Sequence, residues 1–137
     1  MNSKQWICVV EDQADLRFIL QKIFAISLPQ YPVYLFENGQ VLLKELPHLD
    51  PLPSLILMDR HMPVLDGYQT LRQLKQDPAY QLIPVVMMSA DASAVEIKDC
   101  YRAGANSFLR KPISFQLQLE IISQLGQYWL QSNLPAE

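Results

Sequence analysis

The feature that most constrains the fold is a regular alternation of short, mostly apolar runs with segments of helical periodicity. The runs are four or five residues long, which suits buried strands, and they cover residues 7–10, 33–36, 55–58, 84–88 and 107–110. In the segments that follow them, apolar residues recur every three or four positions, the spacing of an amphipathic helix. Such an alternation predicts an α/β fold in which helices cover both faces of one parallel sheet.

The helical segments carry their own start and stop signals. Gly104 suits the left-handed conformation that ends a helix, and Ser114 suits the N-cap position that begins the last one. The expected helices cover residues 15–28, 38–46, 68–76, 93–103 and 114–131, with a short tail at 132–137.

Composition and charge narrow the class of protein. Half of the 137 residues are hydrophobic and 18% are charged, so we expect a single folded domain over residues 1–137. A formal net charge of −3 gives no electrostatic reason to expect nucleic-acid binding, and no apolar run is long enough to cross a membrane. No signal-peptide pattern opens the chain, and Cys8 and Cys100 lack metal-binding or redox spacing. We therefore expect buried, reduced thiols in a cytoplasmic protein.

Chemically active residues gather where the predicted strands end. Glu11 and Asp12 follow the first strand, Asp59 the third, Ser89 ends the fourth, and Lys111 follows the fifth. The carboxyl ends of parallel strands lie at one edge of a sheet, where open α/β sheets bind their ligands. Because crowded carboxylates repel one another, we expect a cation among them, and oxygen ligands of this kind favour Mg²⁺.

The same edge holds the groups that phosphoryl transfer requires. Beside a bound cation, the ionised side chain of Asp59 can attack phosphorus and become an aspartyl phosphate. The Lys111 ammonium and the Ser89 hydroxyl can hold the phosphoryl oxygens as negative charge develops on them. The sequence therefore predicts a site for a divalent cation and a phosphoryl group.

Four motifs, in order along the chain, resemble those of the receiver domain of two-component response regulators. They are Val-Val-Glu-Asp (9–12), Leu-Met-Asp-x-x-Met-Pro-x-x-Asp-Gly (57–67), Met-Met-Ser-Ala (87–90) and Ala-Gly-Ala-Asn-Ser-Phe-Leu-x-Lys-Pro (103–112). The resemblance covers residues 7–129 and implies a flavodoxin-like (βα)5 fold, a doubly wound five-stranded parallel sheet in three α/β/α layers. The ending Leu-Gly-Gln-Tyr-Trp-Leu further resembles stand-alone receivers that partner phytochrome-type histidine kinases.

The resemblance implies roles around the cation. It makes Asp59 the phosphoacceptor, with Asp12 and Asp59 as direct ligands of Mg²⁺ or Mn²⁺. Glu11 would act mainly through a metal-bound water, and His61 would bind through its backbone carbonyl. Asp66, in the same motif, is expected to shape the turn and the start of the next helix.

The remaining matched positions imply a conformational switch. Ser89 matches the hydroxyl that moves toward the phosphoryl group, and Lys111 matches the lysine that senses it. Phe108 matches the aromatic switch position, although it lacks the hydroxyl of the tyrosine often found there. The Lys111–Pro112 bond matches a cis peptide of the family. The switch would shift a two-state equilibrium on the surface of the fourth helix, fifth strand and fifth helix.

Each site residue also has a purely structural interpretation. A carboxylate can cap its own turn, acidic residues favour helix N-termini, and a serine can cap the following helix. A lysine can be solvated, and an aromatic ring can be a static part of the core. Turn capping is the structural interpretation of Asp59, a helix N-terminus that of Glu11 with Asp12, and helix capping that of Ser89. Solvation is the alternative for Lys111, and a static core position is the alternative for Phe108.

Two further positions are candidates for tuning the rate of dephosphorylation. His61 lies two residues after Asp59, and Asp91 lies two residues after Ser89. We hypothesise that the two side chains pair across the site, beside the path of the attacking water. The alternative is that both are solvated loop residues.

The last helix is apolar on more than one side. One line of side chains has to cover the sheet, and the other is a surplus that an isologous homodimer can bury. Alternatively, the tail folds back over its own domain. The first line holds Phe115, Leu119, Ile122 and Trp129, and the second holds Leu117, Ile121, Leu125 and Tyr128.

The predicted function is that of a signalling phosphoacceptor and not of an enzyme. A sensor histidine kinase, a phosphotransfer protein or a small phosphodonor would supply the phosphoryl group. An output protein would bind the switched surface, because no residues remain for an output domain. One alternative is an adaptor that docks without phosphorylation. The other is a phosphohydrolase with an aspartate nucleophile, which would usually need a second carboxylate where this chain has His61.

Overall fold

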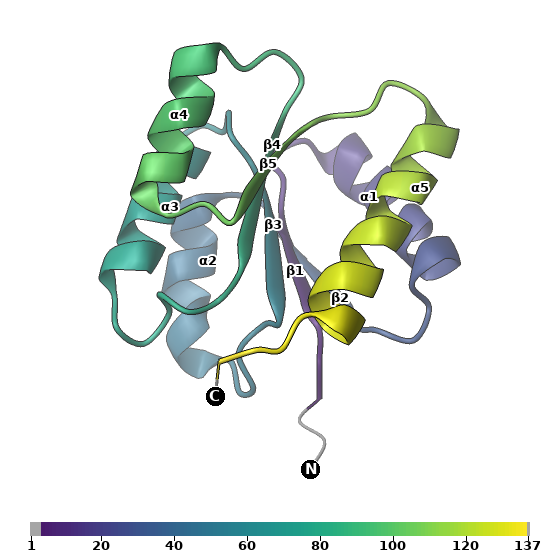
Figure 1. Cartoon of the computed structure of the whole chain (residues 1–137), viewed down its shortest axis with the longest axis horizontal. Helices are drawn as coiled ribbons and strands as arrows, with labels where there is room; N and C mark the ends of the chain where they lie inside the picture. Colours follow the sequence, from purple (N-terminus) through teal and green to yellow (C-terminus); the bar gives the residue numbers. More distant parts are fainter. Residues whose placement is uncertain (1–3, 137) are drawn as a thin grey trace.

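Strands and helices alternate along the chain, as the apolar pattern predicts. The computed structural model describes residues 4–136, and Figure 1 shows their arrangement. The strands are β1 (Ile7–Val10), β2 (Val33–Phe36), β3 (Leu55–Asp59), β4 (Val85–Ser89) and β5 (Ser107–Arg110). The helices are α1 (Ala14–Ser27), α2 (Gly39–Glu45), α3 (Gly67–Gln76), α4 (Ala94–Ala103) and α5 (Phe115–Gly126), with the short η1 (Leu46–His48) and η2 (Gln127–Ser132) after α2 and α5.

The five strands form one parallel sheet in the order β2-β1-β3-β4-β5. Helices α1 and α5 cover one face, and α2, α3 and α4 cover the other (Figure 1). In register, Val10 of β1 lies opposite Met58 of β3, so Glu11, which follows β1, and Asp59, which ends β3, lie side by side. The strand order reverses at β1 and β3, which is where doubly wound sheets place their binding crevice.

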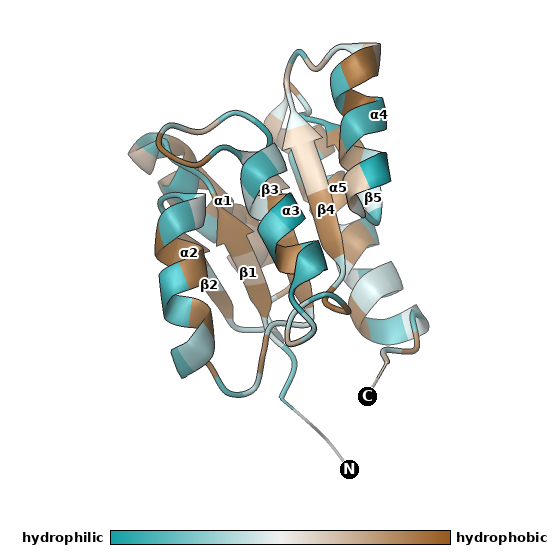
Figure 2. Ribbon diagram, turned by 90° about the vertical axis from the view of Figure 1, so that its left-hand side faces the viewer, coloured by the Kyte–Doolittle hydropathy of each residue, from teal (hydrophilic) through white to brown (hydrophobic). Residues whose placement is uncertain are grey.

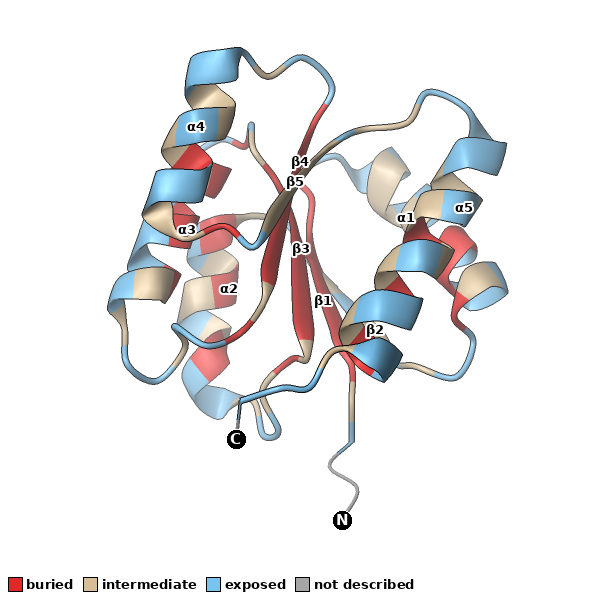
Figure 3. Cartoon of the chain, viewed as in Figure 1, coloured by how far each residue is buried: buried red, intermediate tan, exposed pale blue. Residues whose placement is uncertain are grey.

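The sheet has a core on each face. Successive side chains of a strand point to opposite faces, so Ile7 and Val9 pack toward α1 and α5 while Cys8 and Val10 pack toward the other three helices. Figure 2 shows the hydrophobic strands between helices whose outer faces are mostly hydrophilic, and Figure 3 shows the burial of the central strands. Two-sided burial of the central strands β1, β3 and β4 explains why their sequences are nearly continuous apolar runs.

The predicted helix ends are confirmed at three positions. Gly104 ends α4 with φ of 111°, a left-handed conformation that suits glycine. The Ser114 hydroxyl accepts a hydrogen bond from the Leu117 amide at the start of α5. Asp66 caps α3 and exchanges hydrogen bonds with Gln69, so its predicted role in starting that helix is confirmed.

The apolar lines predicted on the last helix divide differently in the structure. Ile122 is buried, but Phe115 from the same predicted line is 48% exposed. Leu117 and Tyr128 from the second line are also exposed. The expectation that one whole line covers the sheet is therefore wrong, because the first line holds both a buried and an exposed side chain.

The cysteines behave as expected. Cys8 and Cys100 are free and buried, and burial raises the pKa of both thiols. Within residues 4–136, no helix combines the length and the apolar character that crossing a membrane requires. The cytoplasmic location stays a prediction.

Candidate functional site

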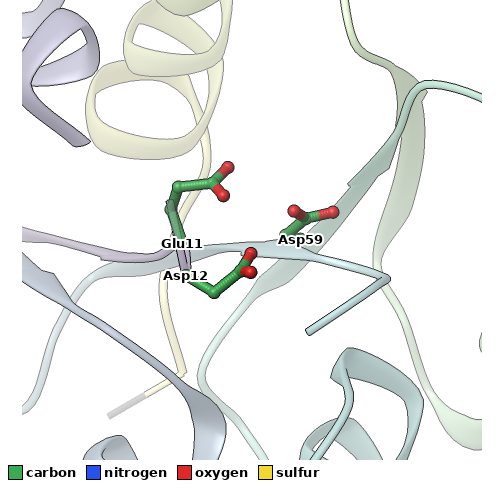
Figure 4. A group of neighbouring side chains, drawn as sticks. All are labelled: Glu11, Asp12 and Asp59. Atoms are coloured by element: carbon green, nitrogen blue, oxygen red, sulfur yellow. The ribbon is translucent and has the colours of Figure 1, made fainter. Parts of the chain in front are cut away.

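Three carboxylates meet at the carboxyl edge of the sheet. One oxygen from each of Glu11, Asp12 and Asp59 lies within 4.8 Å of the others, and Figure 4 shows the side chains directed toward a common space. The side chains of Glu11 and Asp59 are only 3% and 9% exposed, while Asp12 is half-buried. The sheet register produces this cluster, because β1 and β3 are neighbours that end at the same level.

Lys111 completes the cluster from the end of β5. Its Nζ lies 2.9 Å from Asp59 Oδ2 and 2.9 Å from Glu11 Oε1, and its side chain is 22% exposed. Its backbone amide also donates to the Ser89 carbonyl at 2.9 Å. The interpretation of Lys111 as a solvated surface lysine is therefore wrong.

The expected cis bond before Pro112 is also wrong. Within the described residues the cis peptide is Asp50–Pro51, and Lys111–Pro112 is trans. The Lys111 ammonium still reaches the carboxylates, because β5 ends beside β4 and directs the side chain back over that strand.

Burial and charge act against each other in this cluster. Burial raises the pKa of Glu11, the Asp59 charge raises it further, and the hydrogen bond and charge of Lys111 lower it only in part. For Lys111, burial alone would lower the pKa, but its hydrogen bonds to Asp59 and Glu11 and their charges outweigh burial. The pKa of Lys111 is therefore raised. The lysine stays protonated near neutral pH, while Glu11 is held in an environment that disfavours its charge.

Backbone contacts fix the acidic residues, and one of them involves an arginine that the sequence argument missed. The Nη1 atom of Arg17 donates hydrogen bonds to the backbone carbonyl of Glu11 at 2.8 Å and to that of Asp12 at 3.0 Å. Glu11 also accepts from the Gln13 amide, and Asp59 accepts from the His61 amide at 3.3 Å. The carboxylates of Glu11 and Asp59 therefore accept hydrogen bonds from nearby backbone amides and also belong to the acidic cluster. A structural role for these residues does not exclude a functional one.

Gly67 places α3 directly against the end of β3. A Cβ atom at this position would collide with the Asp59 carbonyl oxygen, so only glycine allows the close approach. The Gly67 amide donates to the Arg60 carbonyl at 3.0 Å, which closes the loop after Asp59.

Ser89 and Phe108, the two predicted switch residues, lie on neighbouring strands of the sheet. Ser89 is buried, and its hydroxyl contacts Asp91 through Oδ1 at 3.4 Å and through the amide at 3.3 Å. Ser93 and not Ser89 caps α4, so the capping interpretation of Ser89 is wrong. Phe108 is half-buried against the core that α2, α3 and α4 cover, and its amide donates to the Tyr101 hydroxyl at 3.1 Å.

The two rate-tuning candidates lie within reach of each other. His61 Nε2 is 3.8 Å from Asp91 Oδ1, but it is closer, at 3.6 Å, to Glu96 Oε2 on α4. No sequence pattern predicts Glu96 as a neighbour of His61. The capping-box pattern Ser93-x-x-Glu96 does place the carboxylate in the first turn of a helix.

The fold and the site define the class of protein. A family model described as the response regulator receiver domain matches residues 7–123, and the chain belongs to that family. Receiver domains are signalling phosphoacceptors that bind a divalent metal and are phosphorylated by histidine kinases or phosphotransfer proteins.

Individual relatives agree with this assignment. The chain is 27% identical to the response regulator Rcp1 of Synechocystis sp. over 142 residues, which cover 98% of this chain and 96% of Rcp1. The structure of RPA3017, a response regulator in red light signalling of R. palustris, superposes with a TM-score of 0.87 at 26% identity, covering 97% of this chain and 99% of that one. The phosphorylated cyanobacterial phytochrome response regulator RcpA shares the fold with a TM-score of 0.89 at 24% identity, covering 98% of this chain and 100% of that one. At 24% identity, the likeness to RcpA is one of fold.

Other curated relatives are longer than the region they share with this chain. The match covers 51% of FilR2 of Methanothrix harundinacea, at 33% identity. It covers 30% of a protein-glutamate methylesterase/protein-glutamine glutaminase of Trichodesmium erythraeum, also at 33% identity.

Proposed function

We propose that Asp59 receives a phosphoryl group from a histidine kinase or phosphotransfer protein, and that residues 1–137 act as one receiver unit. The observation that carries this proposal is the Lys111 ammonium, which lies 2.9 Å from both Asp59 and Glu11 at the edge of the sheet. Burying these charges together is costly for stability, so their arrangement favours a binding role. A fixed cation beside a buried carboxylate is suited to holding a phosphoryl group on that carboxylate.

The proposed reaction is a phosphoryl transfer between two side chains. An oxygen of ionised Asp59 attacks the phosphorus of a phosphohistidine on the partner. The bond from phosphorus to this oxygen forms as the bond to the imidazole nitrogen breaks, and the imidazole leaves with the electron pair. Lys111 neutralises charge on the phosphoryl oxygens, and the Ser89 hydroxyl moves toward one of them.

Mg²⁺ or Mn²⁺ fits the ligands that this edge offers. The carboxylates of Glu11, Asp12 and Asp59 are hard oxygen donors within 4.8 Å of one another. We propose Asp12 and Asp59 as direct ligands, Glu11 as a ligand through water, and the His61 backbone carbonyl as a further ligand. When bound, the cation supplies positive charge that offsets the carboxylates and the phosphoryl oxygens.

A cleft beside the site offers a docking position for the phosphodonor. It has a volume of about 320 Å³ and lies between α1 and α5, with Glu11 and Lys111 on its wall. Most of its lining is apolar and includes Leu16, Ile19 and the fully exposed Ile113. A partner that covers this cleft would exclude water from the neighbouring acidic cluster.

The proposed output is a change on the surface of α4, β5 and α5. Movement of Ser89 would leave space that the Phe108 ring fills, and an output protein would recognise the altered surface. The exposed Leu117 and Tyr128, both from the second predicted line, also offer apolar surface for a homodimer. Sedimentation of the phosphorylated and unphosphorylated chain, each at several concentrations, tests the dimer.

Intact mass after incubation with acetyl phosphate and Mg²⁺ tests the proposed function. We expect one phosphoryl adduct in the wild type, and no adduct in Asp59→Asn or after addition of a chelator. The control Asp15→Asn changes an exposed carboxylate on α1 and should be labelled like the wild type.

The same experiment separates the rival functions. A wild-type chain that takes up no adduct from either acetyl phosphate or a phosphorylated kinase favours the adaptor, and the proposal then fails. Rapid multiple turnover of phosphate esters would instead favour the phosphohydrolase.

A further inference from the structure

Arg60, the residue directly after Asp59, joins the phosphoacceptor strand to two helices. Its backbone amide donates to the Met88 carbonyl of β4 at 2.8 Å. Its side chain is only 14% exposed, and its Nη1 atom lies 3.3 Å from Asp66 Oδ2 at the start of α3. Its Nη2 atom lies 3.7 Å from Glu96 Oε2 in the first turn of α4. The residue therefore links the backbone next to Asp59 to the starts of both helices.

Glu96 is the point at which this connection reaches α4. Its side chain accepts a hydrogen bond from the Ser93 amide at 2.9 Å, and its own amide donates to the Ser93 hydroxyl at 3.2 Å. The hydrogen bond to the Ser93 backbone, and the charges of Arg60 and His61, lower the pKa of Glu96. The carboxylate is thus ionised at neutral pH and faces both residues that follow Asp59.

The guanidinium of Arg60 is held incompletely. Each ion pair uses a single nitrogen and is longer than 3.2 Å, so neither has the bidentate geometry that makes arginine pairs strong. Within residues 4–136, the Arg60 Nε is a buried nitrogen without a hydrogen-bond partner. The hydrogen-bonding capacity of this guanidinium is therefore only partly used within the described residues.

We propose that the ion pair between Arg60 and Glu96 is a latch that holds the start of α4 against the loop after Asp59 in the unphosphorylated chain. This inference rests on the proposed function, because the latch is released when Asp59 carries a phosphoryl group. An aspartyl phosphate has more negative charge than the carboxylate that it replaces. Because Arg60 follows Asp59 directly, the added charge in this proposal draws the guanidinium away from Glu96. Release frees the first turn of α4, which belongs to the proposed output surface.

Two substitutions test the latch while keeping its surroundings. Glu96→Gln removes the charge but preserves the capping box, because glutamine at this position also bonds the N-cap amide. Arg60→Met removes the guanidinium and keeps an apolar stem. The matched controls are Glu120→Gln, an exposed carboxylate on α5, and Arg72→Met. Arg72 stacks on the same Tyr68 ring as Arg60 but has no ion pair in the described part of the chain.

The first measurement is hydrogen exchange in the unphosphorylated chain. We expect the amides of Glu96, Ile97 and Lys98 to exchange about two- to fivefold faster in Glu96→Gln and in Arg60→Met, the range for a partly exposed ion pair. The double variant should be no faster than either single one, and the two controls should match the wild type. Unchanged exchange in both single variants, or effects that multiply in the double variant, would overturn the latch.

The second measurement is the initial rate of labelling by acetyl phosphate. Because an open latch resembles the phosphorylated conformation, both variants should be labelled about two- to fivefold faster than the wild type. Equal labelling rates, together with faster exchange, would show that the contact holds α4 but is not coupled to Asp59, which also overturns the proposal. Failure of the wild type to accept label would count against the proposed function, whereas the exchange result concerns the latch alone.

Discussion

The Lys111 ammonium lies 2.9 Å from a carboxylate oxygen of Asp59, although 52 residues separate the two along the chain. Lys111 follows β5 and Asp59 ends β3, with β4 between these strands in the sheet. The pair therefore bridges a whole strand at the edge of the sheet. Any change in the charge or position of Asp59 acts directly on β5 and on the turn that leads to α5.

Removing the Lys111 ammonium should destabilise the metal-free protein. In Lys111→Met, Glu11 and Asp59 keep their burial but lose the cation that neutralises them. We expect a loss of about 2 kcal/mol in the free energy of unfolding, less than the 3–5 kcal/mol for a fully buried pair because Lys111 is partly exposed. Urea denaturation without divalent cations measures this loss. Lys98→Met, on the exposed side of α4, should stay within about 0.5 kcal/mol of the wild type, and equal stability of both variants would contradict the prediction.

Asp12→Asn should separate cation binding from folding. Within residues 4–136, Asp12 makes no ion pair, and its charge adds to the repulsion in the cluster, so the metal-free variant should be at least as stable as the wild type. Mg²⁺ at a hundredfold excess over its Kd should stabilise the wild type by about 2.7 kcal/mol. Mg²⁺ should stabilise Asp12→Asn far less than the wild type. The control Asp15→Asn should keep the wild-type stabilisation by Mg²⁺. Thermal unfolding with and without Mg²⁺ measures it, and an undiminished gain in Asp12→Asn would rule out the ligand role.

The pH dependence of the free energy of unfolding should show that the pKa of Glu11 is raised in the folded chain. Burial, together with the Asp59 charge, raises the pKa of Glu11 above its ordinary value of 4.5, so the folded chain holds this proton more tightly than the unfolded chain. The resulting stability is fully present below pH 4.5 and is lost as the pH rises through the raised pKa. Without divalent cations, the free energy of unfolding of the wild type should therefore fall over this range relative to that of Glu11→Gln. Denaturant titrations at a series of pH values measure this difference. The prediction fails if the free energies of unfolding of the two proteins change in parallel with pH.

The main features of the fold and the acidic site follow from local sequence. The apolar run Ile7–Val10 forms the strand that it predicts, because all four of its residues are buried between the two helical layers. Asp59 and Lys111 meet because parallel strands deliver their carboxyl ends to one edge. These conclusions need only the periodicity of the chain and the topology that it implies.

Other contacts depend on how the helices are placed and could not be read from the sequence. The distance between Arg60 and Glu96 is set by the packing of α4 on the sheet, and no local pattern specifies it. The capping box that starts at Ser93 locates the first turn of α4 but not the residue that it faces. The exposure of Phe115 likewise depends on the angle at which α5 crosses α1. Apolar periodicity does not determine that angle.

His61 is the remaining candidate for controlling how long the phosphoryl group persists. Its imidazole is half exposed and lies 3.8 Å from Asp91 and 3.6 Å from Glu96. We expect it to cover part of the approach to Asp59. We expect His61→Ala to shorten the half-life of the aspartyl phosphate about threefold, a change of about 0.7 kcal/mol in the activation free energy, because water gains access. Loss of the phosphoryl adduct over time, followed by intact mass, measures the half-life.

The other histidine of the chain, His48, provides the matched control for this experiment. His48 lies on η1, remote from the carboxyl edge of the sheet, so His48→Ala should leave the half-life unchanged. Asp91→Ala distinguishes the two neighbours of the imidazole. If the pair with Asp91 positions His61, this variant should shorten the half-life as His61→Ala does, and the double variant should add nothing further. An Asp91→Ala half-life equal to that of the wild type would leave Glu96 as the partner, and an unchanged half-life in His61→Ala would remove His61 from the proposed machinery.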